Sequence, residues 1–443
     1  MNFKTDYRVE KFITDTSWET LPENVKERLR GCFVDLLGAL ISGARSEQFR
    51  VGLRVAKSVF GNGDVAVIGS TDRFNLMGAA AAMGHSSNAY DIDDGHNMTR
   101  THPGTSFVGA VLAAAYERNL ALKDFLTAML VAYEVSLRSG AAIMDYYDYA
   151  HSSGTFGSVG VAVGLGKIFG FDEARLNNVI SVAEFNAPLV PGIRSVEYPS
   201  MNKDGVPFGV IIGMLALAED ECGFTGNKNL LEADEYRHYT EDLGENYEVM
   251  NLYFKPYPCC RWAHPAIDAC LSTMKDNSIG AEDIERVVIK TFKRATLLSK
   301  IEPQSADEAQ YNIAYPVAAA IVHGDFSIDR VMPESLGDPS VLSMMKKLSF
   351  EVDDALDAQF PKKRICRAEI YTNSGEKFVS CDCEPRGEAH ENIGREWLIE
   401  KFYRITASQL SKEAQTALTD IVCGDENTPV RTIVDYINSE LIK

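Results

Sequence analysis

The chain has few basic side chains for its size, and this limits what it can bind. Its 443 residues include 44 Lys and Arg against 63 Asp and Glu, which gives a formal net charge of −19. Nucleic acids and anionic membranes need an extended basic surface, so neither is expected as a main partner. A pocket for a small anion needs only a few local cations, and such a ligand is compatible with this composition.

Long hydrophobic runs and regularly spaced cysteines are also missing. The longest apolar run, Val206–Ala218, is too short to span a bilayer and predicts a buried helix. The residues after Met1 form no apolar secretion signal. The nine cysteines are irregularly spaced and include no Cys-x-x-Cys, so we expect neither a disulfide framework nor a zinc ribbon. These absences favour a cytoplasmic protein.

Helical periodicity dominates the first 255 residues. The segment Pro22–Ala44 repeats apolar residues with a helical period after a Pro-Glu start. Similar patterns predict further helices over 74–90, 104–118, 123–145, 155–170, 172–187 and 206–220. No alternation of strands and helices appears in this part of the chain, so a mostly helical body is expected.

The pattern changes after Lys255-Pro256-Tyr257-Pro258. Residues Ile284–Thr291 alternate like a strand, and Asn373-Ser374-Gly375 is a turn signal between two further strand-like segments. A helix is predicted over 309–323, and residues 391–403 and 408–420 are helical again. The fold class is therefore mainly α, with an α+β lobe inserted into the helical body.

Polar side chains are concentrated between Asp91 and Gly104, with small apolar residues on both sides. Such a cluster is costly to bury unless its members satisfy one another, which makes it a candidate active site. Three interpretations are open. The group Asp91, Asp93, Asp94 and His96 has the ligand types of a divalent metal site. A carboxylate-held histidine could instead move protons while Arg100 binds an anion. Helix capping is the third interpretation.

Two other segments carry reactive side chains. His151 precedes a glycine-rich helix, whose start favours an anion, although the glycines are explained more simply by helix packing. Cys260 lies near Lys255 and Arg261, which predicts a lowered thiol pKa and an acid/base role. The alternative for that segment is an interdomain elbow with inert cysteines.

Further candidates occur in the second half of the chain. Arg194 and Lys203 supply positive charge in the loop before an apolar helix. Tyr311 and Tyr315 share one face of the predicted helix 309–323, because four residues separate them. Taken alone, the two tyrosines are expected to pack in the core.

Four motifs in this order resemble the MmgE/PrpD family, which includes 2-methylcitrate dehydratases, cis-aconitate decarboxylases and iminodisuccinate epimerases. They are Asp91-Ile92-Asp93-Asp94 with Thr101-His102-Pro103, His151-Ser152-Ser153-Gly154-Thr155-Phe156-Gly157, Lys255-Pro256-Tyr257-Pro258 and Tyr311-Asn312-Ile313-Ala314-Tyr315. The resemblance spans nearly the whole chain. It implies a helical domain over 1–258 completed by C-terminal helices over 400–443, and a smaller α+β lid domain over 259–399. It also implies a homodimer, an active site between the domains, and no required cofactor or metal.

The resemblance assigns catalytic roles to five motif residues, namely Asp91, His102, His151, Lys255 and Tyr315. Cys260 is added as a sixth, because its neighbours Lys255 and Arg261 make it an acid/base candidate. The side chains expected to bind the carboxylates of a substrate are Arg100, Thr101, Arg194, Lys203 and Arg261, since guanidinium groups pair with carboxylates in a bidentate way.

The expected chemistry is removal of a proton beside a carboxylate of a small di- or tricarboxylate. His102 or His151 is suited to act as the base, and Tyr315, Cys260 or Lys255 as the second acid. A hydro-lyase like 2-methylcitrate dehydratase is the first prediction, with an epimerase of an aminodicarboxylate as the alternative. A cis-aconitate-type decarboxylase is less favoured, since Arg194 and Cys260 stand where the decarboxylases carry lysine and histidine. A metal-dependent hydrolase is the further alternative.

Overall fold

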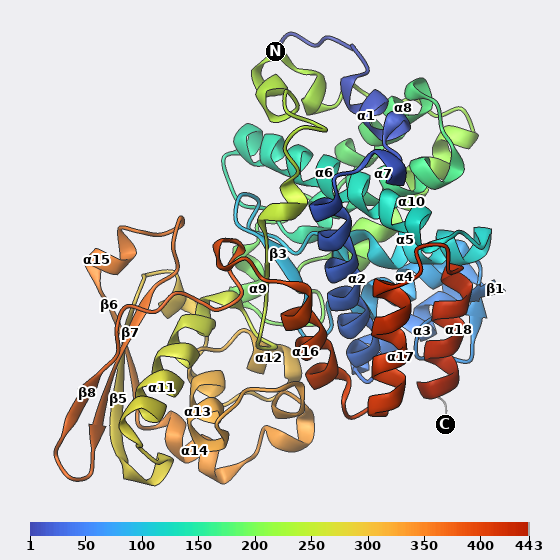
Figure 1. Ribbon diagram of the computed structural model, residues 1–443. Helices are drawn as coiled ribbons and strands as arrows, with labels where there is room; N and C mark the ends of the chain where they lie inside the picture. The colour runs from blue at the N-terminus through green and yellow to red at the C-terminus, as the bar shows by residue number, and fades with distance from the viewer. Residues whose placement is uncertain (442–443) are drawn as a thin grey trace.

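A computed structural model of the protein describes residues 1–441, and most of the predicted helices are present (Figure 1). Their ends differ from the predicted ones by a few residues. Side-chain caps explain several starts: the Asn75 carbonyl accepts from the Gly78 N–H, and the Asp172 carboxylate accepts from the Arg175 N–H. The helices up to residue 221 are α1 (Arg8–Asp15), α2 (Glu23–Gly43), α3 (Glu47–Val55), α4 (Leu76–Ser87), α5 (Thr105–Arg118), α6 (Leu122–Tyr147), α7 (Ser153–Phe169), α8 (Glu173–Phe185), α9 (Ile193–Glu197) and α10 (Val206–Glu221).

Close packing of α7 against α10 depends on glycine, as the sequence indicated. A Cβ atom on Gly209 would lie 2.3 Å from the carbonyl oxygen of Gly154, so no larger residue fits there. The Gly154 N–H also donates to the Asp204 carbonyl oxygen at 2.8 Å. The glycines therefore bring the start of α7 next to Asp204, at the point where α10 begins.

The lid segment, defined here as residues 259–399, contains a four-stranded sheet in the order β6-β5-β7-β8. Strands β5 and β6 are parallel and the other pairs are antiparallel. The predicted turn is confirmed, with Gly375 at a φ of 88° between β7 and β8. Helix α11 lies beside the sheet and contacts β7, and α13 packs against α11 and α14 (Figure 1). The elements are β5 (Ile284–Thr291), β6 (Leu348–Val352), β7 (Cys366–Thr372), β8 (Lys377–Val379), α11 (His264–Asn277), α12 (Ala306–Gln310), α13 (Ala314–His323), α14 (Pro339–Met345) and α15 (Asp354–Asp357).

The helix predicted over 309–323 is interrupted, and this corrects the sequence interpretation. The Ser299 carbonyl oxygen accepts from the Ile313 N–H, and the Ser299 N–H donates to the Tyr311 carbonyl oxygen, so the chain between α12 and α13 pairs with residue 299 in place of continuing the helix. The Asn312 side chain then accepts from the Tyr315 N–H at 2.8 Å. Because of this break, Tyr311 and Tyr315 do not share a helix face.

The C-terminal helices return to the helical body, defined here as the residues outside the lid segment. Helices α16 (Arg395–Thr406) and α17 (Lys412–Cys423) contact α2, and α18 (Val430–Leu441) contacts α5 (Figure 1). The Lys401 ammonium of α16 forms a buried ion pair with Asp35 of α2 at 2.5 Å and donates to the Ile92 carbonyl oxygen at 2.6 Å. The last helices thus support the segment that carries Asp91.

Buried apolar side chains form two clusters. One draws on residues 9–254 and 398–437, and the other consists mainly of lid-segment residues. Two such clusters are expected if residues 1–258 with 400–443 form one domain and residues 259–399 form the other. The domain boundaries themselves stay a prediction. The predicted fold class, mainly α with an α+β portion, is confirmed.

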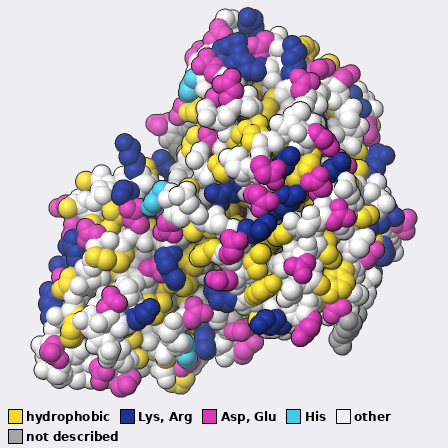
Figure 2. Space-filling model, in the orientation of Figure 1, with side chains coloured by type: hydrophobic (Ala, Val, Ile, Leu, Met, Phe, Trp, Pro, Cys, Tyr) yellow, Lys and Arg dark blue, Asp and Glu magenta, His cyan; other side chains and the backbone are white. Residues whose placement is uncertain are grey.

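The surface agrees with the acidic composition. On the face shown in Figure 2, basic side chains are interspersed with acidic ones and form no continuous basic surface. No helix within residues 1–441 is both long and apolar enough to cross a membrane.

Two short strand pairs complete the fold. Strand β1 (Asn62–Ala66) pairs with β2 (Arg73–Phe74) beside α4. Strand β3 (Asp94–His96) pairs antiparallel with β4 (Leu252–Phe254), with Asp94 opposite Phe254. The second pair joins two motif segments that lie more than a hundred residues apart in the sequence.

Candidate active site

A cavity of about 360 Å³ lies between the helical body and the lid segment. This volume suits a small molecule. Its wall includes charged, aromatic and thiol side chains from both parts of the chain. The lining residues are Asp91, Arg100, His102, Asp148, Tyr149, Ala150, His151, Pro191, Gly192, Ile193, Ser195, Val196, Asp204, Tyr253, Cys260, Arg261, Trp262, Arg294, Tyr311, Phe360 and Arg364.

Asp91 and Lys255 meet because β3 and β4 pair. The Lys255 Nζ lies 2.6 Å from Asp91 Oδ1, and the lysine side chain is fully buried. Burial alone lowers the pKa of Lys255, but the carboxylates of Asp91 and Asp93 outweigh it and raise that pKa. Lys255 does not line the cavity, so it acts on the site through Asp91. Asp91 itself adopts a φ of 51°, a strained conformation for this residue.

His102 is held between carboxylates. Its Nδ1 lies 3.0 Å from Asp93 Oδ2, and its Nε2 lies 3.4 Å from Asp91 Oδ1. The backbone N–H of His102 also donates to Ser153 Oγ at the start of α7. Burial disfavours the charged ring, but Asp93 above all raises the pKa of His102 to about 9. This imidazole is therefore protonated at neutral pH.

His151 has the opposite electrostatic setting. Its ring packs against Tyr149 with centroids 3.9 Å apart, and neither ring nitrogen has a hydrogen-bond partner among residues 1–441. Burial lowers the pKa of His151 to about 4. The cavity thus contains one protonated and one neutral imidazole, and such a separation of pKa values supports division into acid and base.

Asp204 and Tyr311 form another part of the wall. The Tyr311 hydroxyl donates to Asp204 Oδ2 at 3.1 Å. Burial raises the pKa of Asp204, against the opposing effect of His102. The titratable side chains of Asp204 and Tyr311 therefore line the same cavity as His102 and His151.

Metal binding has one geometric candidate within the described part of the chain. Single ligand atoms of Asp91, His102 and Asp204 lie within 4.8 Å of one another. The electrostatics disfavour a cation there, because Lys255 already neutralises Asp91 and the His102 ring is protonated. The predicted ligand group Asp91, Asp93, Asp94 and His96 does not converge among residues 1–441, so that alternative is wrong in its geometry.

The other members of that group have structural partners. Asp94 accepts from the Gly104 N–H at 2.9 Å and from the Tyr133 hydroxyl. The His96 Nε2 pairs with Glu248 Oε2 at 3.1 Å. These contacts fix the shape of the loop that presents His102.

Cys260 lines the cavity, but its predicted lowered pKa is wrong. Burial raises the pKa of this thiol to about 12, and the nearby Asp91 carboxylate acts in the same direction. Lys255 favours the thiolate only weakly, since its charge is already paired with Asp91. Cys260 is therefore a neutral thiol at physiological pH, able to donate a weak hydrogen bond.

Besides Lys255, four more predicted residues do not line the cavity. Arg194 is exposed, and Thr101 is buried with its hydroxyl bonded to Thr99. The Lys203 ammonium lies 3.1 Å from Asp307 and 2.9 Å from the Gln310 side-chain oxygen, and so ties the lid segment to the helical body. The Tyr315 hydroxyl donates to backbone carbonyls of Arg330 and Ser335 within the lid segment.

Several lining residues were missed by the sequence interpretation. Asp204 precedes the helix α10, whose start the glycines place beside α7. Tyr311 belongs to the fourth family motif, but the sequence predicts that its side chain packs in the core. Arg294 and Arg364 have no local signal, because nothing in their sequence neighbourhoods distinguishes them from ordinary surface arginines.

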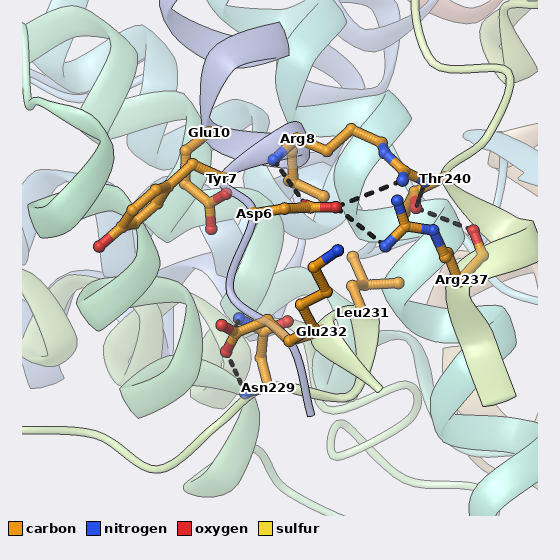
Figure 3. Close-up of a pocket in the computed structure, with 11 residues that line it drawn as sticks. Asp6, Tyr7, Arg8, Glu10, Asn229, Leu231, Glu232, Arg237 and Thr240 are labelled. Atoms are coloured by element: carbon orange, nitrogen blue, oxygen red, sulfur yellow. Dashed lines mark hydrogen bonds and ion pairs between the residues drawn. The ribbon is translucent and has the colours of Figure 1, made fainter. Parts of the chain in front are cut away.

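A second pocket, near the N-terminus, does not have the properties of a site (Figure 3). Its volume is about 10 Å³, enough for one water molecule. Asp6 pairs with Arg237 at 2.9 Å and with Arg8 at 3.4 Å, and Arg8 also donates to Thr240. These polar groups satisfy one another, so this pocket is not a candidate active site.

The fold is mainly α with an α+β portion, and the cavity between the two parts contains two imidazoles whose pKa values are shifted in opposite directions. Residues 8–238 match the MmgE/PrpD N-terminal domain, and residues 257–425 match the MmgE/PrpD C-terminal domain. The chain therefore belongs to the MmgE/PrpD family.

Two curated relatives are similar over almost their whole length. The cis-aconitate decarboxylase-like protein oryM of Aspergillus oryzae is 22% identical, with 97% of this chain and 96% of the relative covered. The cis-aconitate decarboxylase of Homo sapiens is 20% identical, with 91% of this chain and 88% of the relative covered. Proteins of this family include enzymes of the lyase type.

Proposed function

We propose that the protein is a cofactor-independent lyase that removes a proton beside a carboxylate of a small di- or tricarboxylate, with dehydration as the reaction. The observation that carries this proposal is the pair of cavity histidines with opposite protonation. Arginines on the same wall supply the positive charge that a polycarboxylate needs.

In this mechanism His151 is the base, because its neutral ring has free nitrogens. A bound carboxylate beside it raises its basicity. His151 takes the proton from the carbon next to the carboxylate. His102 gives its proton to the leaving hydroxyl group, which departs as water while the carbon–carbon double bond forms. Asp93 holds His102 in the protonated state that this step requires.

Proton NMR in deuterium oxide with a panel of di- and tricarboxylates tests this function. We expect a new vinyl signal with a hydroxylated member of the panel. His151→Gln and His102→Gln should each abolish the signal, whereas His238→Gln should not, since His238 is an exposed histidine outside the cavity. Absence of both turnover and deuterium exchange with every member would overturn the proposal.

Epimerisation is supported by the same histidine pair, since an epimerase needs one acid and one base facing the reacting carbon. Deuterium that enters the substrate without net turnover would favour this alternative. Decarboxylation is supported by the similarity to the cis-aconitate decarboxylase of Homo sapiens. In that case the panel should release carbon dioxide, with His102 returning a proton to carbon.

We also propose that the protein is a homodimer that pairs through α10. Phe208, Ile212 and Leu215 follow one another at helical spacing, and Phe208 and Leu215 are 57% and 41% exposed. Exposed Tyr198 and Phe185 add to the apolar side chains available on this part of the helical body. A second copy can cover such a face around a twofold axis. Light scattering should give twice the chain mass for the unsubstituted protein. The double variant Phe208→Glu, Leu215→Glu should give the mass of one chain. The control Val59→Glu, which changes an exposed apolar residue elsewhere, should keep twice the chain mass.

We propose a cytoplasmic location because the cysteines form no disulfide bonds within residues 1–441. All nine are free thiols, some of them exposed. Exposed free thiols are typical of a reducing compartment.

A further inference from the structure

Two arginines at the cavity have unpaired charges. Arg100 lies in the loop after β3 of the helical body, and Arg294 lies just after β5 of the lid segment. Within residues 1–441, neither guanidinium group forms an ion pair or a side-chain hydrogen bond. The two charges are close enough to affect each other, since the pKa of Arg100 is lowered by burial and then by Arg294. Like charges therefore face the cavity from two different parts of the fold.

The backbone around Arg100 is built to hold it there. Arg100 adopts a φ of 56°, and its N–H donates to the His96 carbonyl oxygen at 2.8 Å. The His96 N–H in turn donates to the Thr101 carbonyl oxygen. A left-handed conformation is unfavourable for an arginine, and such strain is concentrated at functional sites.

A third arginine, Arg364, belongs to the same wall. It is 4% exposed, and its only side-chain partner among the described residues is the Asn97 amide oxygen, at 2.7 Å. Arg261 differs from it, because Glu388 neutralises Arg261 at 2.7 Å. Burial and the positive charges of Arg261 and Arg100 lower the pKa of Arg364. Three guanidinium groups at the cavity thus have no carboxylate of the described chain to pair with.

The carboxylates of the cavity do not compensate for these arginines. Asp91 is paired with Lys255 and His102, and Asp204 accepts from Tyr311. Asp148 also lines the cavity and is exposed, next in sequence to Tyr149 on the His151 side. An anionic ligand is the natural partner of the three arginines, because guanidinium groups form bidentate pairs with carboxylates.

We propose that Arg100, Arg294 and Arg364 form a carboxylate clamp that bridges the helical body and the lid segment. It holds the substrate carboxylates that do not take part in the chemistry, so that the reacting carbon lies at the histidines. Arg294 contributes from the lid, and the ligand removes the repulsion between Arg294 and Arg100. The clamp selects a ligand with at least two carboxylates besides the one at the histidines, that is, a tricarboxylate. This inference rests on the proposed function.

Binding of propane-1,2,3-tricarboxylate tests the clamp without catalysis, since this probe has no hydroxyl group to lose. Trp262 lines the cavity, so its fluorescence reports binding, and calorimetry gives the affinity. Loss of a charge-assisted hydrogen bond weakens binding roughly 10- to 100-fold. We expect this loss for Arg294→Gln and for Arg100→Gln, with partial recovery in Arg294→Lys. Glutarate, a dicarboxylate of the same chain length, should bind the unsubstituted protein more weakly than the tricarboxylate does. Its affinity should also fall less in Arg294→Gln and in Arg100→Gln.

Lys293→Gln is the matched control, because Lys293 is the adjacent exposed cation and does not line the cavity. It should keep the original affinity. The clamp also predicts that Arg100→Gln and Arg294→Gln are not additive, since both contact the same ligand. Unchanged affinity in both variants, equal loss in Lys293→Gln, or no binding of the probe to the unsubstituted protein would overturn the clamp.

The outcome is separable from that of the proposed function. Probe binding that depends on Arg294, together with no turnover of any polycarboxylate, would support the clamp and contradict the lyase. Turnover with probe affinity that does not depend on Arg294 would support the lyase and contradict the clamp.

Discussion

Replacement of Asp93 by Asn tests the electrostatic basis of the mechanism. Asp93 lies 3.0 Å from His102 and is the strongest of the carboxylates that raise the pKa of this histidine from 6.5 to about 9. That shift corresponds to about 3 kcal/mol in favour of the protonated ring. The Asn side chain keeps the shape and can still accept from Asn88, while its amide group stabilises the neutral ring. We expect the pKa of His102 to fall by about 1–3 units.

The pH dependence of kcat/KM measures this change. If protonated His102 is the acid, activity is lost as the pH rises through about 9, and Asp93→Asn should move this alkaline limb toward neutral pH. Stability should change in the same window. The folded pKa is above the unfolded value of 6.5, so the stabilisation from His102 is complete below about pH 6.5 and is lost as the pH rises through about 9.

Glu248→Gln provides the control, since Glu248 pairs with His96 outside the cavity. This variant removes a carboxylate from a histidine of the same loop, and it should leave the alkaline limb unchanged. An unshifted limb in Asp93→Asn, or an equal shift in both variants, would refute the reasoning. Direct NMR titration of the His102 ring separates a change of pKa from a change of rate-limiting step.

Three further results are expected. Tyr311→Phe should lower kcat at least about 10-fold, because it removes the hydroxyl beside Asp204. Tyr315→Phe should lower the free energy of unfolding by about 1 kcal/mol and leave kcat unchanged, because the Tyr315 hydroxyl, among residues 1–441, bonds only to the backbone. Steady-state kinetics and urea unfolding distinguish the two variants, and equal effects on kcat would contradict the assignment. Lys255→Met should destabilise the fold by about 3–5 kcal/mol, because it removes the buried cation nearest to Asp91 and leaves that buried carboxylate only the longer contact with His102. Adding Asp91→Asn should recover part of this loss in urea unfolding. Dialysis against EDTA should leave turnover intact, since Lys255 and protonated His102 already neutralise the Asp91–His102–Asp204 group, the one ligand group found among residues 1–441. Loss of activity that zinc or magnesium restores would contradict this.

The fold was predictable where local pattern decides it. The helix predicted over 206–220 and the strand predicted over 284–291 are present, because burial on one face imposes a period that the sequence displays. The predicted helix 309–323 failed for a non-local reason. Ser299 pairs with residues 311–313, and nothing in the sequence near Tyr311 indicates that partner.

The candidate site was predictable only in part. Asp91, His102 and His151 were singled out from their motifs, and the structure brings all three to one cavity. Arg194 and Tyr315 were singled out too, but the structure places them away from it. Tyr315 is a motif residue that bonds to backbone carbonyls within the lid segment, and a sequence does not distinguish such a position from one that faces the cavity.

The sequence by itself determined the mainly α class, the change of pattern near Lys255 and the family. These properties depend on periodicity and on short motifs, which are local. Only the tertiary structure decided the protonation of the residues. Asp93 raises the pKa of His102, whereas burial beside Tyr149 lowers that of His151 and burial raises that of Cys260. A pKa depends on the charges and the solvent around a group, and these come from segments that meet only in the folded chain.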